Sequence, residues 1–430
     1  MKDGGRLAAA IEVLAEMENR HRPVQAALKD WGNSHRFAGS GDRTVIGNLV
    51  FDALRNKASL SAHMGSEEPR AIVLATYALT WDKGVEALNA ALEQDRHAPE
   101  PLSEVETASL TSGRTGDLSA SATADVPDWL WPEFLEAFGD EAEAEGIALA
   151  TRAPVDLRAN TLKSDQEKIL KRLAHTGAVA TKLSPHGVRI EAKPGLARMP
   201  HIQAEEGYRK GWFELQDEAS QLAALLAQAK PGEQVLDYCA GGGGKTLALA
   251  AAMQNKGQLY AYDADRLRLA PIHERLQRAG VRNIQVRDPA SSTLADLEAQ
   301  MDLVFIDAPC TGTGVWRRRP DSKWRLAEKA LNDRIEDQRN VLRAASRYVK
   351  SGGRLVYVTC SVLLRENQRQ ADWFLNENKD FRALSVIDIW KSVLPGRGEP
   401  KYVSERGEIL MTPASSNTDG FFVSMFERQS

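Results

Sequence analysis

Asp237-Tyr-Cys-Ala-Gly-Gly-Gly-Gly-Lys-Thr246 is the stretch that decides the fold of this 430-residue chain. It ends a short apolar run, Val235–Tyr238, and leads into a segment with helical spacing, Lys245–Met253. A glycine loop between a strand and a helix brings backbone close to a ligand at the helix amino terminus. Two nucleotide-binding motifs are excluded, because a P-loop needs glycine where Cys239 stands and a dinucleotide fingerprint needs glycine or alanine where Thr246 stands. For the loop taken alone, a plain structural turn is the alternative interpretation.

The alternation of short apolar runs with helical segments continues from this loop towards the carboxyl terminus. Such alternation predicts an α/β fold with a parallel sheet covered by helices on both faces. Ligands of these sheets bind at the carboxyl ends of the strands, so the residues after each strand are candidates for a site. The further expected strands are Gln258–Tyr262, Ile284–Val286, Asp302–Ile306 and Arg354–Val358, and the further expected helices are Leu267–Ala279, Ala327–Val349 and Asn367–Asn376.

Composition divides the preceding part of the chain. Residues up to about 96 have apolar side chains at helical spacing, which predicts helices. Residues 99–125 are rich in Ser, Thr, Gly and Asp, which predicts a long loop or linker. Short strand-like runs then flank a helical stretch at 166–175. We therefore expect a helical domain at 1–140 with a linker around 99–125, a small α/β domain at 141–213 and a larger α/β domain at 214–430.

The overall composition excludes several classes of protein. Hydrophobic residues make up 43% of the chain and charged residues 27%, which is enough apolar surface for a packed core. The longest apolar stretch, Ala71–Leu79, is far shorter than the ~20 residues that cross a bilayer. Asp3, Glu12 and Glu16 interrupt any signal-peptide core, so we expect a cytoplasmic protein. Because the net charge is −4, nucleic-acid contacts would have to come from local basic patches.

The cysteines are Cys239, Cys310 and Cys360, an odd number with wide spacing. This spacing fits neither a disulfide framework nor a zinc site, and the histidines show no metal-ligand spacing, so no metal is expected. A lone cysteine is most often a small core residue, which is the interpretation that we favour for Cys239. Cys310 and Cys360 instead follow two predicted strands, where packing alone is a poor explanation.

Acidic residues follow three of the predicted strands. Asp263 lies about 20 residues beyond the glycine loop, where an acidic side chain accepts hydrogen bonds from ribose hydroxyls. It is also suited to cap the next helix, and both roles can hold together. Asp288 is placed either to contact an adenine or to cap a turn. Asp307 opens the most specific stretch, Asp307-Ala-Pro-Cys310.

A basic run follows Cys310. Its cations are accompanied by Trp316 and Trp324 and by one acidic residue, Asp321. Basic residues among aromatic ones suit phosphate contacts and base stacking, although an isolated run of this kind is more often a solvated charged loop. Next to a candidate site we favour RNA binding. The residues concerned are Arg317, Arg318, Arg319, Lys323 and Arg325.

Several of these motifs together resemble a known family. They fall in the order found in the RsmB/Sun family of RNA (cytosine-5) methyltransferases, and the likeness runs from about Val155 to the carboxyl terminus. The helical first part resembles, through Phe37–Leu54, the NusB-like RNA-binding domain of the family member that acts on 16S ribosomal RNA. The likeness is carried by Asp307-Ala-Pro-Cys310, Arg317-Arg-Arg-Pro-Asp-Ser-Lys-Trp324, Thr359-Cys-Ser361 with Glu366-Asn367, and Asp419-Gly-Phe-Phe422.

One stretch departs from the family pattern. The family's glycine loop usually reads Ala-Pro-Gly-Gly-Lys, whereas this chain has Gly241-Gly-Gly-Gly-Lys245. Losing the proline makes the loop more flexible and lowers the expected affinity for the cofactor. Both trailing glycines and the lysine remain.

The resemblance implies a Rossmann-like methyltransferase domain that uses S-adenosylmethionine and acts on RNA. Carbon 5 of cytosine is a poor nucleophile, so its methylation needs transient covalent attack at carbon 6. The resemblance assigns this attack to Cys360 and a part in product release to Cys310. Asp307 would hold the base, and Lys245 would assist at the base and near the cofactor. The cofactor contacts carried over are Cys239, Ala240, Gly241, Gly242, Gly243, Gly244, Lys245, Asp263, Arg268, Asp288 and Asp307.

Small-subunit ribosomal RNA is the expected partner, with the target cytosine in a single strand or flipped out of a helix. Transfer RNA or another RNA is the alternative substrate, and we expect a monomer without membrane contact. DNA cytosine methylation is disfavoured, because that family follows its Pro-Cys with Glu-Asn-Val and this chain has Thr-Gly-Thr after Cys310. The hypothesis from another class is a non-catalytic RNA-binding factor for ribosome assembly, and the intact Lys245, Asp307, Cys310 and Cys360 argue against it.

Overall fold

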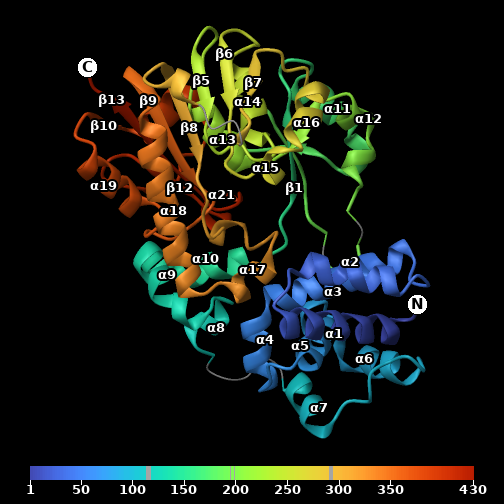
Figure 1. The fold of residues 1–430 in the computed structure, drawn as a ribbon. Coiled ribbons are helices and arrows are strands. Elements are labelled where there is room, and N and C mark those ends of the chain that lie inside the picture. Colours follow the sequence, from blue (N-terminus) through green and yellow to red (C-terminus); the bar gives the residue numbers. More distant parts are fainter. Residues whose placement is uncertain (113–117, 194, 198, 290–293) are drawn as a thin grey trace. The chain divides into compact units, whose positions relative to one another are not determined.

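The chain forms two compact units (Figure 1). The computed structural model describes residues 1–430 apart from 113–117, 194, 198 and 290–293. Neither unit is continuous in sequence, because the chain passes between them several times. The domain boundaries expected at residues 140 and 213 stay a prediction. Unit 1 comprises Met1–Arg152, Ala192–Met199 and Trp316–Leu326, and unit 2 comprises Ala153–Glu191, Pro200–Val315 and Ala327–Ser430.

Unit 1 is helical, as the apolar spacing of its sequence predicts. Helix α1 (Asp3–Arg20) buries Leu7, Leu14 and Met17 along one face. Helix α5 (Pro69–Ala75) begins with proline, which suits a position whose N–H has no partner within the helix. The other helices of this unit are α2 (Val24–Ser34), α3 (Ser40–Arg55), α4 (Lys57–Met64), α6 (Gly84–Glu93), α7 (Glu104–Thr111), α8 (Ala120–Thr123), α9 (Trp131–Phe138), α10 (Ala142–Leu149) and α17 (Pro320–Arg325).

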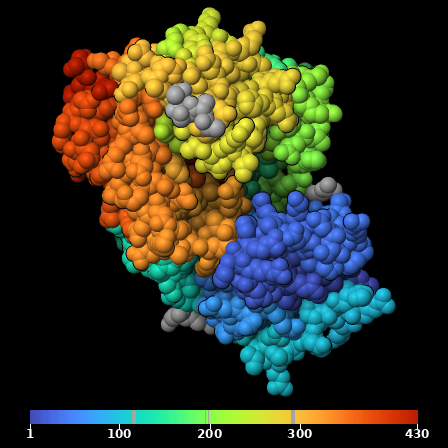
Figure 2. Space-filling model, in the orientation of Figure 1, coloured from blue at the N-terminus to red at the C-terminus, as the bar shows by residue number. Residues whose placement is uncertain are grey.

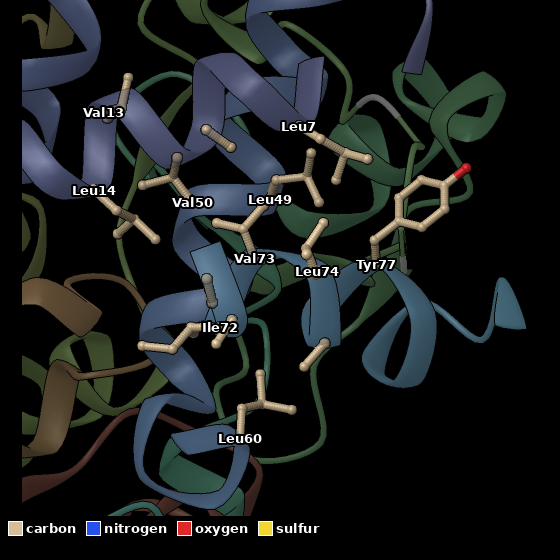
Figure 3. Packing of buried hydrophobic residues seen from close by; sticks show 14 of the residues in the cluster. Leu7, Val13, Leu14, Leu49, Val50, Leu60, Ile72, Val73, Leu74 and Tyr77 are labelled. Carbon is tan, nitrogen blue, oxygen red and sulfur yellow. The ribbon is translucent and has the colours of Figure 1, made fainter. Parts of the chain in front are cut away.

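The core of unit 1 is built where α1, α3 and α5 meet. Leu7, Leu49 and Val73, one from each helix, are at most 1% exposed. Figure 3 shows their side chains among those of Val13, Val50 and other members of the same cluster. Burying one such side chain contributes roughly 1.5–3 kcal/mol, so this contact is a principal source of stability for the unit.

The linker expected around 99–125 is wrong over part of its length, because α7 and α8 lie within it. The Ser103 hydroxyl accepts a hydrogen bond from the Glu106 N–H, and the Glu106 carboxylate accepts one from the Ser103 N–H. This reciprocal pair is a capping box that starts α7. Serine at this position therefore marks a helix start, not only a loop. Residues 113–117 of the expected linker lie outside the described residues.

Unit 2 begins with a small antiparallel sheet, which was expected as a small α/β segment. Its strands lie in the order β2-β3-β1-β4. Within it, the Arg189 guanidinium donates two hydrogen bonds of 2.7 Å to the carboxylate of Asp156 on the neighbouring strand, and both residues are buried. The elements are β1 (Val155–Ala159), α11 (Gln166–Arg172), β2 (Val179–Ala180), β3 (Gly187–Ile190), α12 (Glu206–Arg209) and β4 (Phe213–Leu215).

The larger sheet of unit 2 carries the candidate site. Its strands lie in the order β11-β12-β13-β9-β8-β5-β6-β7, and β10 pairs with β13. The strands β5 to β9 run parallel, so their carboxyl ends share one edge of the sheet. Their bounds are β5 (Gln234–Asp237), β6 (Gln258–Ala261), β7 (Ile284–Val286), β8 (Met301–Asp307), β9 (Val349–Thr359), β10 (Phe381–Leu384), β11 (Tyr402–Val403), β12 (Ile409–Met411) and β13 (Phe421–Arg428).

Both faces of this sheet are covered by helices. The run Leu303-Val-Phe-Ile306 in β8 is completely buried, which is why it reads as a continuous apolar stretch. Helices α13 (Glu218–Leu226), α14 (Gly244–Ala252) and α20 (Val386–Val393) share one core with Phe305. Helix α18 (Glu328–Ser346) packs against β8 and β9, and its outer side chains are visible in orange in Figure 2. The remaining helices are α15 (Arg266–Leu269), α16 (Ile272–Ala279), α19 (Gln368–Glu377) and α21 (Pro413–Ser416).

Two expectations about this sheet change in the structure. The sheet is mixed rather than parallel, since β13 runs antiparallel between β9 and β12. The helix expected at Leu267–Ala279 is divided into α15 and α16, because Pro271 has no N–H to continue the hydrogen-bond ladder. Among the helices that the structure describes, none has the length and apolar character needed to cross a membrane.

Candidate active site

Cys310 and Cys360 lie side by side at the carboxyl ends of neighbouring strands. Cys310 comes shortly after β8 and Cys360 directly after β9, and these strands pair in parallel. The two sulfur atoms are 3.3 Å apart, both thiols are free, and both side chains are partly exposed. The hydrogen bond with Cys360, and then burial, raise the pKa of the Cys310 thiol well above its usual range. Two accessible thiols in hydrogen-bond contact form a site that can act on a ligand.

Lys245 and Asp307 form an ion pair at the same edge of the sheet. The Lys245 ammonium lies 2.6 Å from Asp307 Oδ2 and 5.0 Å from the centre of the Phe421 ring. Lys245 is 7% exposed, whereas the side chain of Asp307 is 35% exposed. The lysine is therefore held by the protein, and the carboxylate can reach a ligand. The structure thus brings together the four residues for which the family resemblance implies catalytic roles.

The glycine loop before α14 has a backbone that side chains rarely adopt. Gly241 and Gly243 have φ angles of +49° and +83°. A Cβ on Gly243 would lie 2.6 Å from Ile272, so this position needs glycine for space as well. The family's proline corresponds to position 242, and a residue before proline is pushed to extended backbone. Gly241 does not have that extended backbone, because its φ angle of +49° is left-handed.

Asp263 follows β6 and holds the glycine loop. Its Oδ2 accepts the Gly241 N–H at 2.9 Å and its Oδ1 accepts the Asp265 N–H at 2.8 Å. The helix cap expected of Asp263 belongs instead to Asp265, whose carboxylate accepts the N–H groups of Leu267 and Arg268 at the start of α15. The cap assignment was wrong because α15 begins at Arg266, which places the N-cap position at Asp265. A ribose contact for Asp263 stays a prediction.

Arg268 and Asp288 lie in exposed positions near this edge of the sheet. The Arg268 side chain is 55% exposed and lies 4.0 Å from the Asp263 carboxylate, and Asp288 follows β7. Their cofactor contacts stay predictions. In the part of the chain that the structure describes, no group of three or more His, Cys, Asp or Glu side chains is arranged to hold a metal ion.

Two groups at the start of the loop, Cys239 and Asp237, have raised pKa values. Burial, and then the carboxylates of Asp263 and Asp237, raise the pKa of the Cys239 thiol, which fits a core residue better than a nucleophile. Asp237 is fully buried, and its Oδ2 accepts the Thr246 hydroxyl at 2.6 Å. Burial raises the pKa of Asp237 to about 7. No role was predicted for Asp237, although its place at the end of a strand was a usable signal.

Glu366 and Asn367 are further residues at this site for which no role was predicted from the sequence. Both are completely buried, and they contact the two segments that carry the thiols. The only sequence signal was their presence in the stretch that carries the family resemblance.

The residues at the sheet edge fit the cofactor that the resemblance implies. A Cβ added at Gly241 or Gly244 would lie 3.6 Å or more from the nearest described protein atom, so this side of the loop leaves room for a ligand. The amino terminus of α14 favours a carboxylate, such as that of an amino acid moiety. The Asp263 carboxylate keeps lone pairs for ribose hydroxyls, since each oxygen accepts one backbone hydrogen bond here.

The basic run after Cys310 is not a continuous exposed surface. It belongs to unit 1, where Lys323 is 1% exposed and its ammonium donates to the backbone carbonyls of Asp125 and Arg55. Arg317 is 2% exposed. The assignment of Lys323 and Arg317 to RNA contacts is wrong for this structure, because a buried cation cannot reach a phosphate.

The other cations of the run are accessible. Arg319 and Arg325 are exposed and Arg318 is half-buried, with Arg325 lying 2.9 Å from the Asp321 carboxylate. Contact of these arginines with RNA stays a prediction.

Comparison with known sequences finds two families. Residues 223–427 match the family described as 16S rRNA methyltransferase RsmB/F, and residues 126–196 match a ferredoxin-like domain of RsmF/B-like methyltransferases. A relative in Synechocystis sp., named probable ribosomal RNA small subunit methyltransferase B, is 32% identical over 310 residues. That alignment covers 70% of this chain and 66% of the relative.

Solved structures share the fold. The crystal structure of PH0851 has a TM-score of 0.74 at 25% identity, and the match covers 99% of each chain. The structure of NSun6 from Pyrococcus horikoshii, solved with SFG, has a TM-score of 0.60 at 22% identity and covers 71% of this chain and 99% of its own.

Proposed function

Since this chain belongs to the RsmB/F family of methyltransferases, we propose that it methylates carbon 5 of a cytosine in RNA. S-adenosylmethionine is the methyl donor and small-subunit ribosomal RNA the substrate. The observation that supports this reaction best is the pair of thiols, 3.3 Å apart, next to the Lys245–Asp307 ion pair. The chain spans 66% of the length of the Synechocystis relative, so that relative's name does not by itself decide the substrate.

Cys360 is the nucleophile. Its thiolate forms a bond to carbon 6 of the cytosine, and the electron pair of the 5,6 double bond moves to carbon 5, which becomes nucleophilic. The bound S-adenosylmethionine supplies an electrophilic methyl group. Cys360 follows β9 directly, so a rigid strand of the sheet fixes its position.

Asp307 and Lys245 orient the base and stabilise the charge that develops on it. The exposed part of the Asp307 carboxylate accepts a hydrogen bond from the exocyclic amine of cytosine. The Lys245 ammonium, held beside it at 2.6 Å, offers a positive charge and a donor where the ring becomes electron-rich.

Cys310 completes the reaction. Its thiolate takes the proton from carbon 5, the electron pair of that C–H bond restores the 5,6 double bond, and Cys360 leaves as a thiolate. The raised pKa keeps the Cys310 thiol protonated in the free protein, so it releases that proton to solvent before its thiolate acts as the base.

The cofactor is held by the loop Cys239–Lys245 and by Asp263, Arg268 and Asp288, and the RNA by Arg318, Arg319 and Arg325. The target base must leave its stack to expose carbon 6, so a single-stranded or flipped cytosine is the substrate. The protein acts as a cytoplasmic monomer, with domains at 1–140, 141–213 and 214–430.

The deciding experiment incubates the protein with labelled S-adenosylmethionine and unmodified small-subunit ribosomal RNA and maps any 5-methylcytosine. Label at a single cytosine is expected. If no label appears although the cofactor binds, transfer RNA and assembled particles are tested next. If neither label nor cofactor binding is found, the chain is a non-catalytic RNA-binding factor and the proposal fails.

Two cysteine variants separate the roles of the thiols. Cys360→Ala should abolish methylation while cofactor binding is unchanged, because no bond to carbon 6 can form. Cys310→Ala should accumulate a covalent protein–RNA complex that survives denaturing electrophoresis, because the proton on carbon 5 is not removed. Normal turnover by Cys360→Ala, or no trapped complex with Cys310→Ala, would contradict the respective assignment.

A further inference from the structure

Two consecutive buried residues, Glu366 and Asn367, contact the two segments that carry the thiols. Both are completely buried just before α19. The Tyr357 hydroxyl donates a 2.7 Å hydrogen bond to the Glu366 backbone carbonyl, which fixes the pair against β9. A buried carboxylate is unfavourable unless hydrogen bonds satisfy it, so its partners are informative.

Glu366 holds the residue after Cys310. Its Oε1 accepts the Thr311 N–H at 2.8 Å and its Oε2 accepts the Thr311 hydroxyl at 2.5 Å. The amide of Gln338, on α18, donates both to Glu366 Oε1 and to the carbonyl of Pro309, each at 3.0 Å. The backbone on both sides of Cys310 is therefore fixed by this network.

Asn367 holds the residues on both sides of Cys360. Its Oδ1 accepts the Thr359 hydroxyl at 2.5 Å, and its Nδ2 donates to the Ser361 carbonyl at 2.9 Å. The two segments are also joined directly, since the Gly314 N–H donates to the Cys360 carbonyl at 2.9 Å.

We propose that Glu366 and Asn367 form a thiol clamp, a pair of positioning residues that sets the separation between the Cys310 and Cys360 sulfur atoms. Glu366 contacts Thr311 on the Cys310 side and the Ser361 side chain on the Cys360 side. Asn367 contacts the residues on both sides of Cys360. Because the two residues are adjacent in the chain, a single peptide unit links the two positions. The clamp itself is a property of the fold, and its effect on turnover rests on the proposed function.

A trivalent arsenical tests the spacing without RNA or cofactor. Phenylarsine oxide reacts with two neighbouring thiols to form two sulfur–arsenic bonds, and its oxygen leaves as water with the two thiol protons. We expect one such adduct per chain, detected by mass, and its loss in Cys310→Ala. Failure of the parent protein to form the adduct would overturn the proposal, since the two thiols would not be in reach of one arsenic atom.

The clamp variants are Glu366→Ala and Asn367→Ala. Each should lower the affinity for the arsenical by at least about tenfold, because the second bond depends on the local concentration of the second thiol. Glu366→Gln should restore it, since its amide can still accept the Thr311 N–H and can donate to the Thr311 hydroxyl, which then acts as acceptor. The exposed Glu377→Ala, on α19, is the matched control and should bind like the parent protein.

Two results would contradict the clamp. One is an unchanged affinity in a folded Glu366→Ala protein, and the other is a Glu366→Gln protein as defective as Glu366→Ala. If Glu366→Ala does not fold, Thr311→Val removes only the hydroxyl bond and should still weaken the adduct; unchanged binding there would equally overturn the proposal.

Turnover measurements distinguish the effect of the clamp on the spacing of the thiols from its effect on methylation. On unmodified RNA that the parent protein methylates, Glu366→Ala should lower kcat by about a hundredfold with little change in KM for the cofactor, the cost expected for a misplacement of ~1 Å. If the parent protein methylates no RNA, the proposed function fails, whereas the arsenical result still tests the clamp. A weakened adduct with unchanged kcat would show that the spacing is set by the clamp but does not matter for the reaction.

Discussion

Lys323 is a buried cation of unit 1 that is held by backbone carbonyls. Its ammonium donates hydrogen bonds to two backbone carbonyls, and it lies 4.9 Å from the centre of the Trp324 ring and 5.6 Å from that of Trp316. Burial lowers the pKa of this lysine to about 8, with Asp125 opposing the shift. Carbonyl dipoles and aromatic faces thus hold a charge that the sequence presents as a phosphate contact.

The depressed pKa makes the stability of unit 1 depend on pH. Between the pKa of about 8 in the folded chain and the ordinary value of 10.5, the unfolded chain keeps a proton that the folded one has released. The free energy of unfolding therefore rises with pH across this window. Below about pH 8 both states hold the proton, and the lysine no longer makes the free energy of unfolding depend on pH. The melting temperature of the parent protein, relative to Lys323→Met, should rise from about pH 7.5 to about pH 9.5. If the melting temperatures of the two proteins change in parallel with pH, the lowered pKa of Lys323 is contradicted.

At the scale of elements, the loop that carries Cys310 is packed directly against the segment that enters β13. The Gly420 N–H donates to the Gly314 carbonyl at 2.8 Å, and a Cβ on Gly314 would lie 2.3 Å from the Gly420 carbonyl oxygen. Backbone meets backbone here, so no side chain can move aside to make room.

Gly314→Ala should therefore destabilise unit 2 by about 1–3 kcal/mol, the usual cost of overpacking, and disturb the neighbouring thiol. Chemical denaturation measures the first effect and arsenical binding the second. Gly41→Ala is the matched control, because a Cβ there meets no described atom within 4 Å and the residue lies inside α3. That variant should be neutral or more stable, by up to about 1 kcal/mol. Equal effects of the two substitutions would show that close packing is not the cause.

The elements that could be predicted from the sequence are those with a local signal. The parallel strands read as continuous apolar runs because both of their faces are buried, as in Leu303–Ile306. Strand β13 is as deeply buried, but its antiparallel place between β9 and β12 depends on how the chain returns to the sheet. Periodicity carries no such information, so the sheet was expected to be parallel.

The residues of the site also divide into those with a local sequence signal and those without one. Cys310, Cys360 and Asp307 could be placed from their positions after predicted strands. The contacts of Glu366 could not, since they join residues 55 positions apart through side chain to backbone hydrogen bonds. The burial of Lys323 could not be predicted either, because it depends on the packing of α17 in unit 1.

At the scale of the whole molecule, unit 1 is completed by a segment from late in the chain. Trp316–Leu326 contributes α17 to it, and the Trp316 ring stacks on Phe134 with 5.7 Å between ring centres. The Trp324 indole N–H donates to the Leu54 carbonyl at 2.6 Å. A short distant segment is thus part of the core of the helical unit.

Trp316→Ala should lower the free energy of unfolding of unit 1 by about 3–5 kcal/mol, because it leaves a cavity beside Phe134. Trp316→Phe should cost much less, since the indole N–H of Trp316 makes no hydrogen bond within the described residues. Trp129→Ala, in the same unit at a 38% exposed position, is the control and should change the unfolding midpoint little. A similar loss for Trp129→Ala and Trp316→Ala would contradict a specific role for the inserted segment.

The late segment also has a consequence for synthesis on the ribosome. A nascent chain that has reached Arg152 still lacks α17, which is made about 170 residues later. At roughly 5–20 residues per second, the helical unit waits on the order of ten to thirty seconds for its last piece while the surface around Phe134 remains open. The segment Met1–Arg152 therefore emerges first but finishes folding late, and a chaperone that covers exposed apolar surface has its longest opportunity there.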